Sequence, residues 1–285
     1  MEENRTNINW YPGHMAKTKR QITEDMKLID VVIELLDSRI PISSQNPNIA
    51  EITKNKKKII VLNKCDLSDE KQNKLWVEYF KSKNIPAVLV DSNSGKGIDN
   101  FIKEVEKIMQ VDLEQHAQKG RTGRKIRAMI LGIPNVGKSS FINRIAKRTS
   151  AGVGNKPGVT KQKQWIRIND KIELLDTPGI LWPKLDDETV AHNLAAMTAI
   201  KEEVLDSEDI AIYIIQKMLK EYPDNIINRY NITEKEDIII ILDEIGKKIG
   251  ALRNSETDYD RVYKRVIKDL QDGYLGKVTF DKIKV

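Results

Sequence analysis

The sequence lacks the features that mark several large classes of protein. Its 285 residues contain one cysteine, Cys65, so neither an intramolecular disulfide nor a paired-cysteine metal site can form. No apolar run approaches the roughly 18 residues that a membrane-spanning helix needs. Residues 1–10 are polar and contain no apolar stretch of the secretory-signal kind. These absences predict a soluble, cytoplasmic protein.

The composition favours a folded chain with an excess of positive charge. Hydrophobic residues make up 40% of the sequence and charged residues 32%, which permits a packed core and argues against intrinsic disorder. The formal net charge is +6. A protein with excess lysine and arginine binds polyanions more tightly, because these side chains displace counterions from phosphates. The same charge also keeps a protein soluble. The charge alone therefore leaves nucleic-acid binding open.

The first part of the chain alternates between apolar runs and helical patterns. Each short apolar, β-branched run is followed by a polar loop and then by helical spacing. This alternation predicts an α/β fold with a mostly parallel sheet and flanking crossover helices. The predicted strands are Val31–Leu36, Ile59–Leu62, Ala87–Val90 and, after a linker at Gln115–Arg124, Ile126–Leu131; helices are expected near Asn46–Thr53, Asp69–Lys81 and Ile98–Met109.

The pattern changes towards the end of the chain. Asn169 and Asp170 are turn residues between two strand-like runs, Gln164–Ile168 and Lys171–Leu175. After about Lys184 the strand signals stop and helical spacing replaces them. We therefore expect an α/β domain over residues 1–184 and a helical domain over residues 185–285. Helices are expected near Glu188–Ile200, Glu208–Leu219, Lys235–Ile249 and Asp258–Leu270.

A phosphate-binding loop follows the strand Ile126–Leu131. The segment Gly132–Ser139 reads Gly-Ile-Pro-Asn-Val-Gly-Lys-Ser and matches GxxxxGK[ST] in full. Its glycines allow backbone amides to turn towards phosphate oxygens, Lys138 reaches the β- and γ-phosphates, and Ser139 offers a hydroxyl to Mg²⁺. The helix N-terminus behind the loop adds positive partial charge. The predicted contacts here are Asn135, Val136, Gly137, Lys138, Ser139 and Ser140.

A second Mg²⁺ ligand and a γ-phosphate sensor are expected at Asp176–Gly179, which reads Asp-Thr-Pro-Gly. Asp176 follows an apolar strand and can hold Mg²⁺, while Gly179 can offer its amide to the γ-phosphate. By itself this pattern is also a common turn, but its place 38 residues beyond Lys138 is typical of P-loop GTPases. Thr160, between the two motifs, is a candidate switch threonine that completes the Mg²⁺ shell.

The segment Asn63-Lys64-Cys65-Asp66 follows the strand Ile59–Leu62 and predicts guanine recognition. The Asp66 carboxylate can accept hydrogen bonds from guanine N1–H and N2–H₂, whereas adenine lacks both donors and leaves the carboxylate unpaired. Asn63 either braces the loop or contacts N7, and the stem of Lys64 can cover the base. Ser92 and Asn93 lie where a backbone amide is expected to meet guanine O6, although the usual Ser-Ala-Lys sequence is missing.

These motifs occur in an unusual order, because the base motif precedes the phosphate loop. A circular permutation produces this order when old termini are joined and a new break is made, and Gln115–Arg124 would be the join. The order also connects Asp176–Gly179 directly to the helical domain. Together with Trp10–Lys17 (Trp-Tyr-Pro-Gly-His-Met-Ala-Lys) and Asp37–Pro41 (Asp-Ser-Arg-Ile-Pro), it closely resembles the circularly permuted GTPases of the YlqF/RbgA family.

The resemblance covers essentially the whole chain and implies a bacterial factor for late assembly of the large (50S) ribosomal subunit. It implies GTP hydrolysis stimulated by the ribosomal particle, with GTP or GDP and Mg²⁺ as ligands. It also implies 23S rRNA and ribosomal proteins as partners, an rRNA-binding helical domain and no membrane partner; we expect a monomer. The positions that carry over are Asn63, Lys64 and Asp66 for the base, Gly132–Ser139 for the phosphates, and Thr160 and Asp176–Gly179 for the switches.

The group that orients the attacking water is not evident from the motifs. Ras-like proteins place glutamine after the DxxG glycine, but Ile180 occupies that position and cannot hydrogen-bond to water. His14 is one candidate, since an imidazole can position or deprotonate water; the alternatives are an rRNA contact or a simple loop histidine. Asn135 is another candidate, because it resembles the asparagine that holds K⁺ in potassium-stimulated GTPases; otherwise it is a turn residue after Pro134.

Basic residues gather in several clusters, and each is either a solvated face or part of an RNA-binding surface. Trp10, Tyr11 and Trp182 either stack on bases or are buried. Two other functions remain open: a GTP-dependent RNA-binding module without hydrolysis, and a GTPase that acts on another RNA complex. The clusters are Lys17–Arg20, Lys54–Lys58, Lys119–Arg127, Lys161–Lys163 and Arg261–Lys268.

Overall fold

The computed structural model describes residues 20–120, 123–150, 165–175, 187–197 and 206–284. The chain divides into two compact units. The first unit holds the described residues up to 175, together with Ile283 and Lys284, and the second holds those from 187 to Lys282. None of the helices in these ranges is both long enough and apolar enough to cross a membrane.

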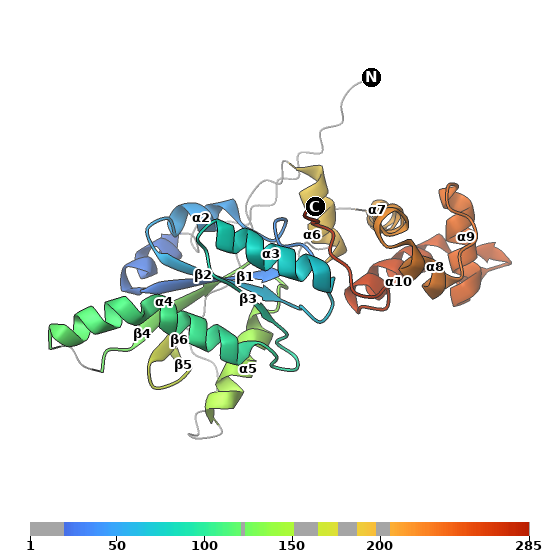
Figure 1. The fold of residues 1–285 in the computed structure, drawn as a ribbon. Helices are drawn as coiled ribbons and strands as arrows, with labels where there is room; N and C mark the ends of the chain where they lie inside the picture. Colours follow the sequence, from blue (N-terminus) through green and yellow to red (C-terminus); the bar gives the residue numbers. More distant parts are fainter. Residues whose placement is uncertain (1–19, 121–122, 151–164, 176–186, 198–205, 285) are drawn as a thin grey trace. The chain divides into compact units, whose positions relative to one another are not determined.

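The first unit is built on a six-stranded sheet (Figure 1). The strand order is β3-β2-β1-β4-β6-β5, and all neighbouring pairs are parallel except β5 and β6. The central strand β1 is buried at every position, as its apolar sequence requires. The predicted mostly parallel sheet is confirmed. The strands are β1 (Val31–Asp37), β2 (Lys57–Asn63), β3 (Ala87–Val90), β4 (Ile126–Leu131), β5 (Trp165–Arg167) and β6 (Ile172–Leu175).

Helices cover both faces of this sheet. In Figure 1, α2 (Pro47–Ile52) and α3 (Glu70–Ser82) lie on one side, and α4 (Ile98–Gln118) and α5 (Lys138–Ser150) lie on the other. Val32 and Leu36 point to the first face, where they join core clusters that also contain residues of α2 and α3. On the opposite face, Phe101 of α4 meets Phe141 of α5 edge to face, with 5.2 Å between ring centroids.

The chain before β1 and the chain's end both pack in the first unit. Residues 20–25 are helical and lead into the 3₁₀ turn η1 (Met26–Leu28). At the other end, the Ile283 amide donates to Gln72 Oε1 of α3 at 2.8 Å, and the Ile283 side chain packs against a cluster that includes Trp76 and Phe80. The last described residues therefore anchor on α3.

The second unit is helical and contains one small hairpin. Asp187, Asp206, Asp237 and Asp258 each cap a helix by accepting backbone amide hydrogen bonds in its first turn. The elements are α6 (Glu188–Ala196), α7 (Ser207–Glu221), α8 (Pro223–Tyr230), α9 (Ile238–Ile249), β7 (Leu252–Arg253), β8 (Glu256–Thr257) and α10 (Tyr259–Gln271).

The core of the second unit centres on α7 and α10, with one buried carboxylate among its apolar contacts. Val262, Val266 and Leu270 of α10 are buried, as the helical spacing predicts. Asp269, only 1% exposed, accepts hydrogen bonds from Arg229 Nε at 2.7 Å and from the Tyr230 hydroxyl at 3.0 Å. Because both donors come from the end of α8, this carboxylate ties α8 to α10.

Three expectations about the elements are wrong. The predicted linker Gln115–Arg124 begins too early, because α4 continues to Gln118. Helix α8 has no counterpart in the predicted helices, although Pro223 is at its first turn and Asn231 ends it in the left-handed conformation. Strand signals do not stop completely after Lys184, since β7 and β8 pair antiparallel around Asn254 and Ser255, both with positive φ.

Candidate functional site

The motif residues converge because parallel strands end at one edge of the sheet. Asp37 ends β1 and is in register with Asn63 at the end of β2, which in turn is in register with Val90 at the end of β3. The phosphate loop begins at Gly132, directly after the parallel strand β4. The chain progresses from β1 outward to β3, and from β4 outward in the other direction. The order of the strands therefore reverses between the neighbouring strands β1 and β4. α/β sheets bind ligands at such a switch point, beyond the carboxyl ends of the strands.

Asn63 joins the base motif to the phosphate loop. Its Nδ2 donates to the Val136 carbonyl at 2.8 Å, and its Oδ1 accepts from the Ser92 hydroxyl at 2.6 Å. Asn63 is 1% exposed. Of the two roles expected for Asn63, this geometry supports bracing rather than contact with N7.

Lys64 forms a second connection between the same two loops. Its Nζ donates to the Asn135 carbonyl at 2.8 Å and lies 3.0 Å from Asp37 Oδ2. Asp37 also receives the guanidinium of Arg39, with Nε to Oδ1 at 2.9 Å and Nη2 to Oδ2 at 2.8 Å. Burial alone would raise the pKa of Asp37, but the charges of Arg39 and Lys64 hold that pKa well below its usual range. Asp37 is therefore an ionised anchor that fixes the Lys64 ammonium.

The Asp37–Arg39 pair was not predicted to have a role at the site. Arg39 is 2% exposed, so the pair is fully buried and each charge depends on the other. A sequence signal existed, since Asp37 follows an apolar strand directly and Arg39 lies two residues later. The sequence could not show that Lys64, from another strand, shares the same carboxylate.

Asp66 has the features required of a base-reading carboxylate. Its Oδ1 is buried, and among the described residues it has no hydrogen-bond partner. Burial raises the pKa of Asp66, and the nearby carboxylates of Asp91 and Asp37 act in the same direction. A buried oxygen without a donor is costly in the free protein. Guanine fits this position, because its N1–H and N2–H₂ groups supply the missing donors.

The loop after β3 is folded around Asp91. Its Oδ1 accepts from the Asn93 amide at 2.8 Å and from the Ser94 amide at 3.2 Å. The Ser92 amide donates to Asn63 Oδ1 at 3.3 Å, which adds to the bond from the Ser92 hydroxyl. Both amides expected to meet guanine O6, those of Ser92 and Asn93, are thus engaged within the protein. The O6 contact stays a prediction, and Ser92 acts here as a partner of Asn63.

The phosphate loop has the backbone shape that its sequence predicts. Asn135 and Gly137 both have positive φ, at 61° and 91°. A Cβ built at Gly137 would lie 2.4 Å from Asn63 Nδ2, so only glycine fits beside that side chain. Helix α5 begins at Lys138, and Ser139 and Ser140 lie exposed on its first turn. The hydroxyl of Ser139 therefore suits a bound Mg²⁺, and the exposed Asn135 side chain permits a K⁺ contact.

The remaining predicted site residues lie outside the described parts of the chain. These are His14, Thr160, Asp176 and Gly179, together with Ile180. Within the described ranges, no group of three or more His, Cys, Asp or Glu side chains could hold a metal ion. The predicted Mg²⁺ site therefore depends on Ser139 and on residues outside those ranges.

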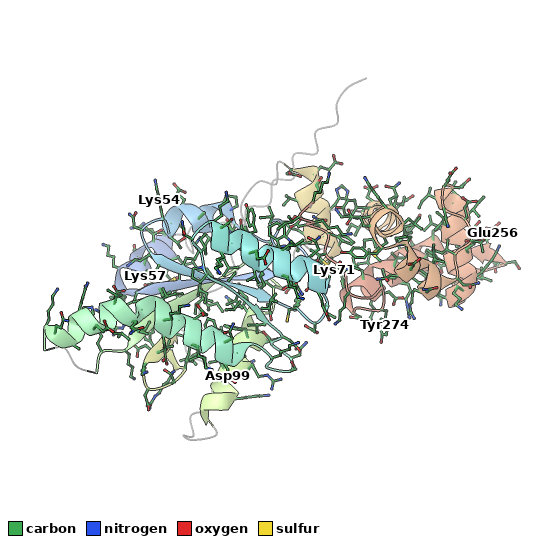
Figure 2. All side chains as sticks on the ribbon, viewed as in Figure 1. Lys54, Lys57, Lys71, Asp99, Glu256 and Tyr274 are labelled. Atoms are coloured by element: carbon green, nitrogen blue, oxygen red, sulfur yellow. The ribbon has the colours of Figure 1, made fainter. Side chains whose placement is uncertain are left out.

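Two of the basic clusters are occupied by partners within the protein. Lys56 Nζ donates to the Ile29 carbonyl at 2.7 Å, Lys57 (labelled in Figure 2) pairs with Asp112 at 2.7 Å, and Lys58 pairs with Glu34 at 3.0 Å. In the second cluster, Arg124 pairs with Asp30 at 2.5 Å and Arg127 with Glu173 at 2.9 Å. Most of the described basic residues of these two clusters are therefore paired within the protein. On α10, the side chains of Arg261, Lys264 and Lys268 are exposed, and Arg265, which is also exposed, pairs with Asp269 at 2.8 Å.

Comparison with known proteins finds relatives that match almost the entire chain. The ribosome biogenesis GTPase A of Bacillus cereus is 46% identical over 276 residues, which are 96% of this chain and 93% of that protein. The same-named protein of Thermotoga maritima is 29% identical and covers the same share of this chain, with 94% of its own length matched. A family model described as 50S ribosome-binding GTPase matches residues 127–244.

Solved structures show the same fold. The crystal structure of GNP-bound YlqF from T. maritima matches 94% of this chain and 100% of its own, with a TM-score of 0.65 and 25% identity. The GDP-bound structure of the same protein also gives a TM-score of 0.65, at 24% identity. It matches 92% of this chain and 99% of its own. The permuted order of base motif and phosphate loop is thus compatible with a known architecture.

Proposed function

The chain belongs to the ribosome biogenesis GTPase A family, and we propose that it hydrolyses GTP in a late step of large-subunit assembly. The observation that carries the nucleotide assignment is the buried, unpartnered Oδ1 of Asp66 among the described residues, next to a phosphate loop already held in shape. The names of the relatives support the biological step. The particle itself would be the large ribosomal subunit, contacted through 23S rRNA and ribosomal proteins.

In this proposal, separate groups of described residues bind the base and the phosphates of the nucleotide. Asp66 accepts from guanine N1–H and N2–H₂, and this selects guanine over adenine. The amides of Asn135 to Ser140 and the Lys138 ammonium bind the phosphates, and the N-terminus of α5 adds favourable charge. Lys64 covers the base while it remains anchored by Asp37 at 3.0 Å. The phosphate loop is already held in shape by Asn63 and Lys64, which lowers the cost of ordering it when the nucleotide binds.

Metal ions complete the phosphate site in this proposal. Ser139, with Thr160 and Asp176, would hold Mg²⁺, which offsets the charge on the β- and γ-phosphates. Asn135 would hold K⁺ next to the same phosphates, in the position where other GTPases use a cationic side chain. Asn135 is an exposed residue of the phosphate loop, and its carbonyl is bonded to Lys64 at 2.8 Å.

The attacking water needs an orienting group, because Ile180 has no polar atom in its side chain. We assign this role to His14 or to a group of the docked particle. Gly179 and Thr160 would sense the γ-phosphate and order the switches, and hydrolysis would then release the factor. Slow turnover alone and fast turnover on the particle follow from this assignment.

Steady-state GTP hydrolysis with and without purified large subunits tests the proposal. The expected result is slow turnover alone in KCl, slower turnover when NaCl replaces KCl, and a large rate increase when subunits are added. His14→Ala should reduce the stimulated rate while GDP affinity stays unchanged. A rate that subunits leave unchanged, while the protein still binds them, would contradict the assembly role; no hydrolysis under any condition would favour the GTP-dependent RNA-binding module.

A further inference from the structure

Arg144 connects the phosphate-loop helix to the loop that follows β3. It lies on α5, six residues after Lys138, and is partly buried. Its Nε donates to the Ser92 carbonyl at 3.0 Å. Residues 92 and 144 are 52 positions apart in the chain, so this contact exists only in the folded protein.

The stem of Arg144 also packs against the same loop. A Cβ built at Gly95 would lie 3.2 Å from Arg144 Cδ, and Gly95 has a φ of +89°. The Gly95 amide donates to the Asp91 carbonyl at 2.8 Å and closes the loop. Glycine at position 95 therefore gives both the turn and the room for the arginine stem. Arg144 thus holds the loop Asp91–Gly95 at two points.

Ser92 is the point where three segments meet. Its amide and hydroxyl bond to Asn63 of the base motif, its carbonyl bonds to Arg144 of α5, and Asn63 in turn bonds to the Val136 carbonyl of the phosphate loop. A change at Arg144 would therefore move the carbonyl of Ser92 and the amides of the two residues after it. Of these two amides, that of Asn93 is one of the two expected to meet guanine O6.

Anchoring α5 does not require this arginine. Phe141 is fully buried against Phe101 of α4, and Ile145 is 1% exposed, so the apolar face of the helix already fixes α5 to the unit. Arg144 is adjacent to that face and reaches toward the ligand edge of the sheet. Its contacts serve the position of the loop more than the position of the helix.

We propose that Arg144 is a positioning residue for guanine recognition, which holds the loop Asp91–Gly95 at the six-position of the base without contacting the nucleotide. This inference rests on the guanine site proposed above. In this proposal, different residues recognise the two edges of the base. Asp66, which follows β2 by three residues, reads the one- and two-positions of the base, whereas recognition of the six-position depends on a residue of the phosphate-loop helix.

The test compares three nucleotides by competition against a fluorescent GDP derivative, at a pH where all the bases are neutral. 6-Thio-GDP replaces O6 by sulfur, a weaker acceptor, and IDP lacks the two-amino group. Arg144→Ala should weaken GDP binding about tenfold, the size expected when a hydrogen bond from a charged group is removed. It should also shrink the preference for GDP over 6-thio-GDP, while the preference for GDP over IDP stays as in the wild type.

Two further variants separate positioning from general damage. Lys147→Ala removes a positive charge from an exposed position of the same helix and should leave both preferences unchanged. Arg144→Lys keeps the charge and part of the stem and should restore part of the preference for GDP over 6-thio-GDP. The inference is overturned if Arg144→Ala leaves the GDP to 6-thio-GDP ratio unchanged, or lowers both preferences equally. A wild-type protein that binds ADP as well as GDP would instead overturn the guanine site itself.

Discussion

At the scale of single residues, recognition of the base depends on a carboxylate that is poorly placed until the ligand arrives. Asp66 Oδ1 is buried, and no donor among the described residues reaches it. Its charged form is therefore disfavoured in the free protein, first by burial and then by the neighbouring carboxylates of Asp91 and Asp37. Guanine removes this penalty because it supplies donors to the ionised form.

This predicts a pH-dependent preference for guanine. Burial raises the pKa of free Asp66, and guanine lowers it by binding the ionised form, so binding releases a proton. The preference for GDP over IDP should be constant at neutral pH and should fall as acid protonates Asp66 in the two complexes, since titration of Asp66 in the free protein cancels in the ratio. The ratio of the two dissociation constants is the measurement, because titration of the phosphates cancels in it.

The control for this titration is Asp99→Asn, at an exposed position of α4, which should leave the profile unchanged. Circular dichroism at each pH establishes that the protein stays folded. A preference for GDP over IDP that persists into the acid range, while the fold is intact, would show that ionised Asp66 does not read the two-amino group.

At the scale of elements, the centre of the sheet could be predicted and the exceptions have physical causes. β1, β2, β3 and β4 are runs of apolar, largely β-branched residues, and such runs favour buried parallel strands. Helix α8 was missed because its eight residues are too short to show a clear period. The β7–β8 hairpin was missed because each strand has two residues, so turn residues are its main signal.

The candidate site also contains features that the sequence predicts and contacts that it does not. The sequence predicts Gly132–Ser139 and Asn63–Asp66, because these motifs are local and each residue's chemistry is set by its neighbours. It cannot predict that Lys64 shares the carboxylate of Asp37, or that Arg144 bonds to Ser92, because these contacts join segments far apart in the chain. The assignment of His14, Thr160, Asp176 and Gly179 still depends on sequence alone.

The phosphate loop yields a prediction about one glycine. Gly137→Ala would place a Cβ 2.4 Å from Asn63 Nδ2, and Asn63 is held at both ends of its amide. The φ of +91° adds backbone strain. We expect the free energy of unfolding to fall by about 1–3 kcal/mol, from strain at a left-handed non-glycine residue, and GDP affinity to fall tenfold or more. Urea unfolding and fluorescent-nucleotide titration measure the two effects.

Gly120→Ala is the matched control. Its φ is +72°, but no described atom lies within 4 Å of a Cβ built there, so it has the strain without the clash. It should lose about 1–2 kcal/mol of stability and retain normal GDP affinity. Equal GDP affinity in the two variants would show that the close approach of Gly137 to Asn63 is unimportant for the nucleotide site.

At the scale of the whole molecule, the permuted order changes which segments the nucleotide site connects. In the chain, the base motif precedes the predicted join at Gln115–Arg124 and the phosphate loop follows it. Hydrogen bonds made by Asn63, Lys64 and Arg144 nevertheless connect the two parts. The sheet's last strand before the helical unit, β6, ends one residue before Asp176. The segment expected to sense the γ-phosphate is therefore close in the chain to α6, which begins 12 residues after Asp176.

The surface charge of the whole chain gives the last prediction. The net charge is +6, but the clusters at 54–58 and 119–127 are largely paired within the fold, which leaves the exposed face of α10 as the strongest described candidate for RNA phosphates. Lys264→Glu combined with Lys268→Glu should weaken binding to large subunits and lower the slope of log affinity against log salt by about 1 for each phosphate that the protein no longer neutralises. GTP hydrolysis without subunits should stay unchanged.

Lys103→Glu with Lys107→Glu on α4 makes the same change in net charge, and its salt slope should match the wild type. If both double variants reduce the affinity equally, the overall charge rather than α10 directs the protein to the particle.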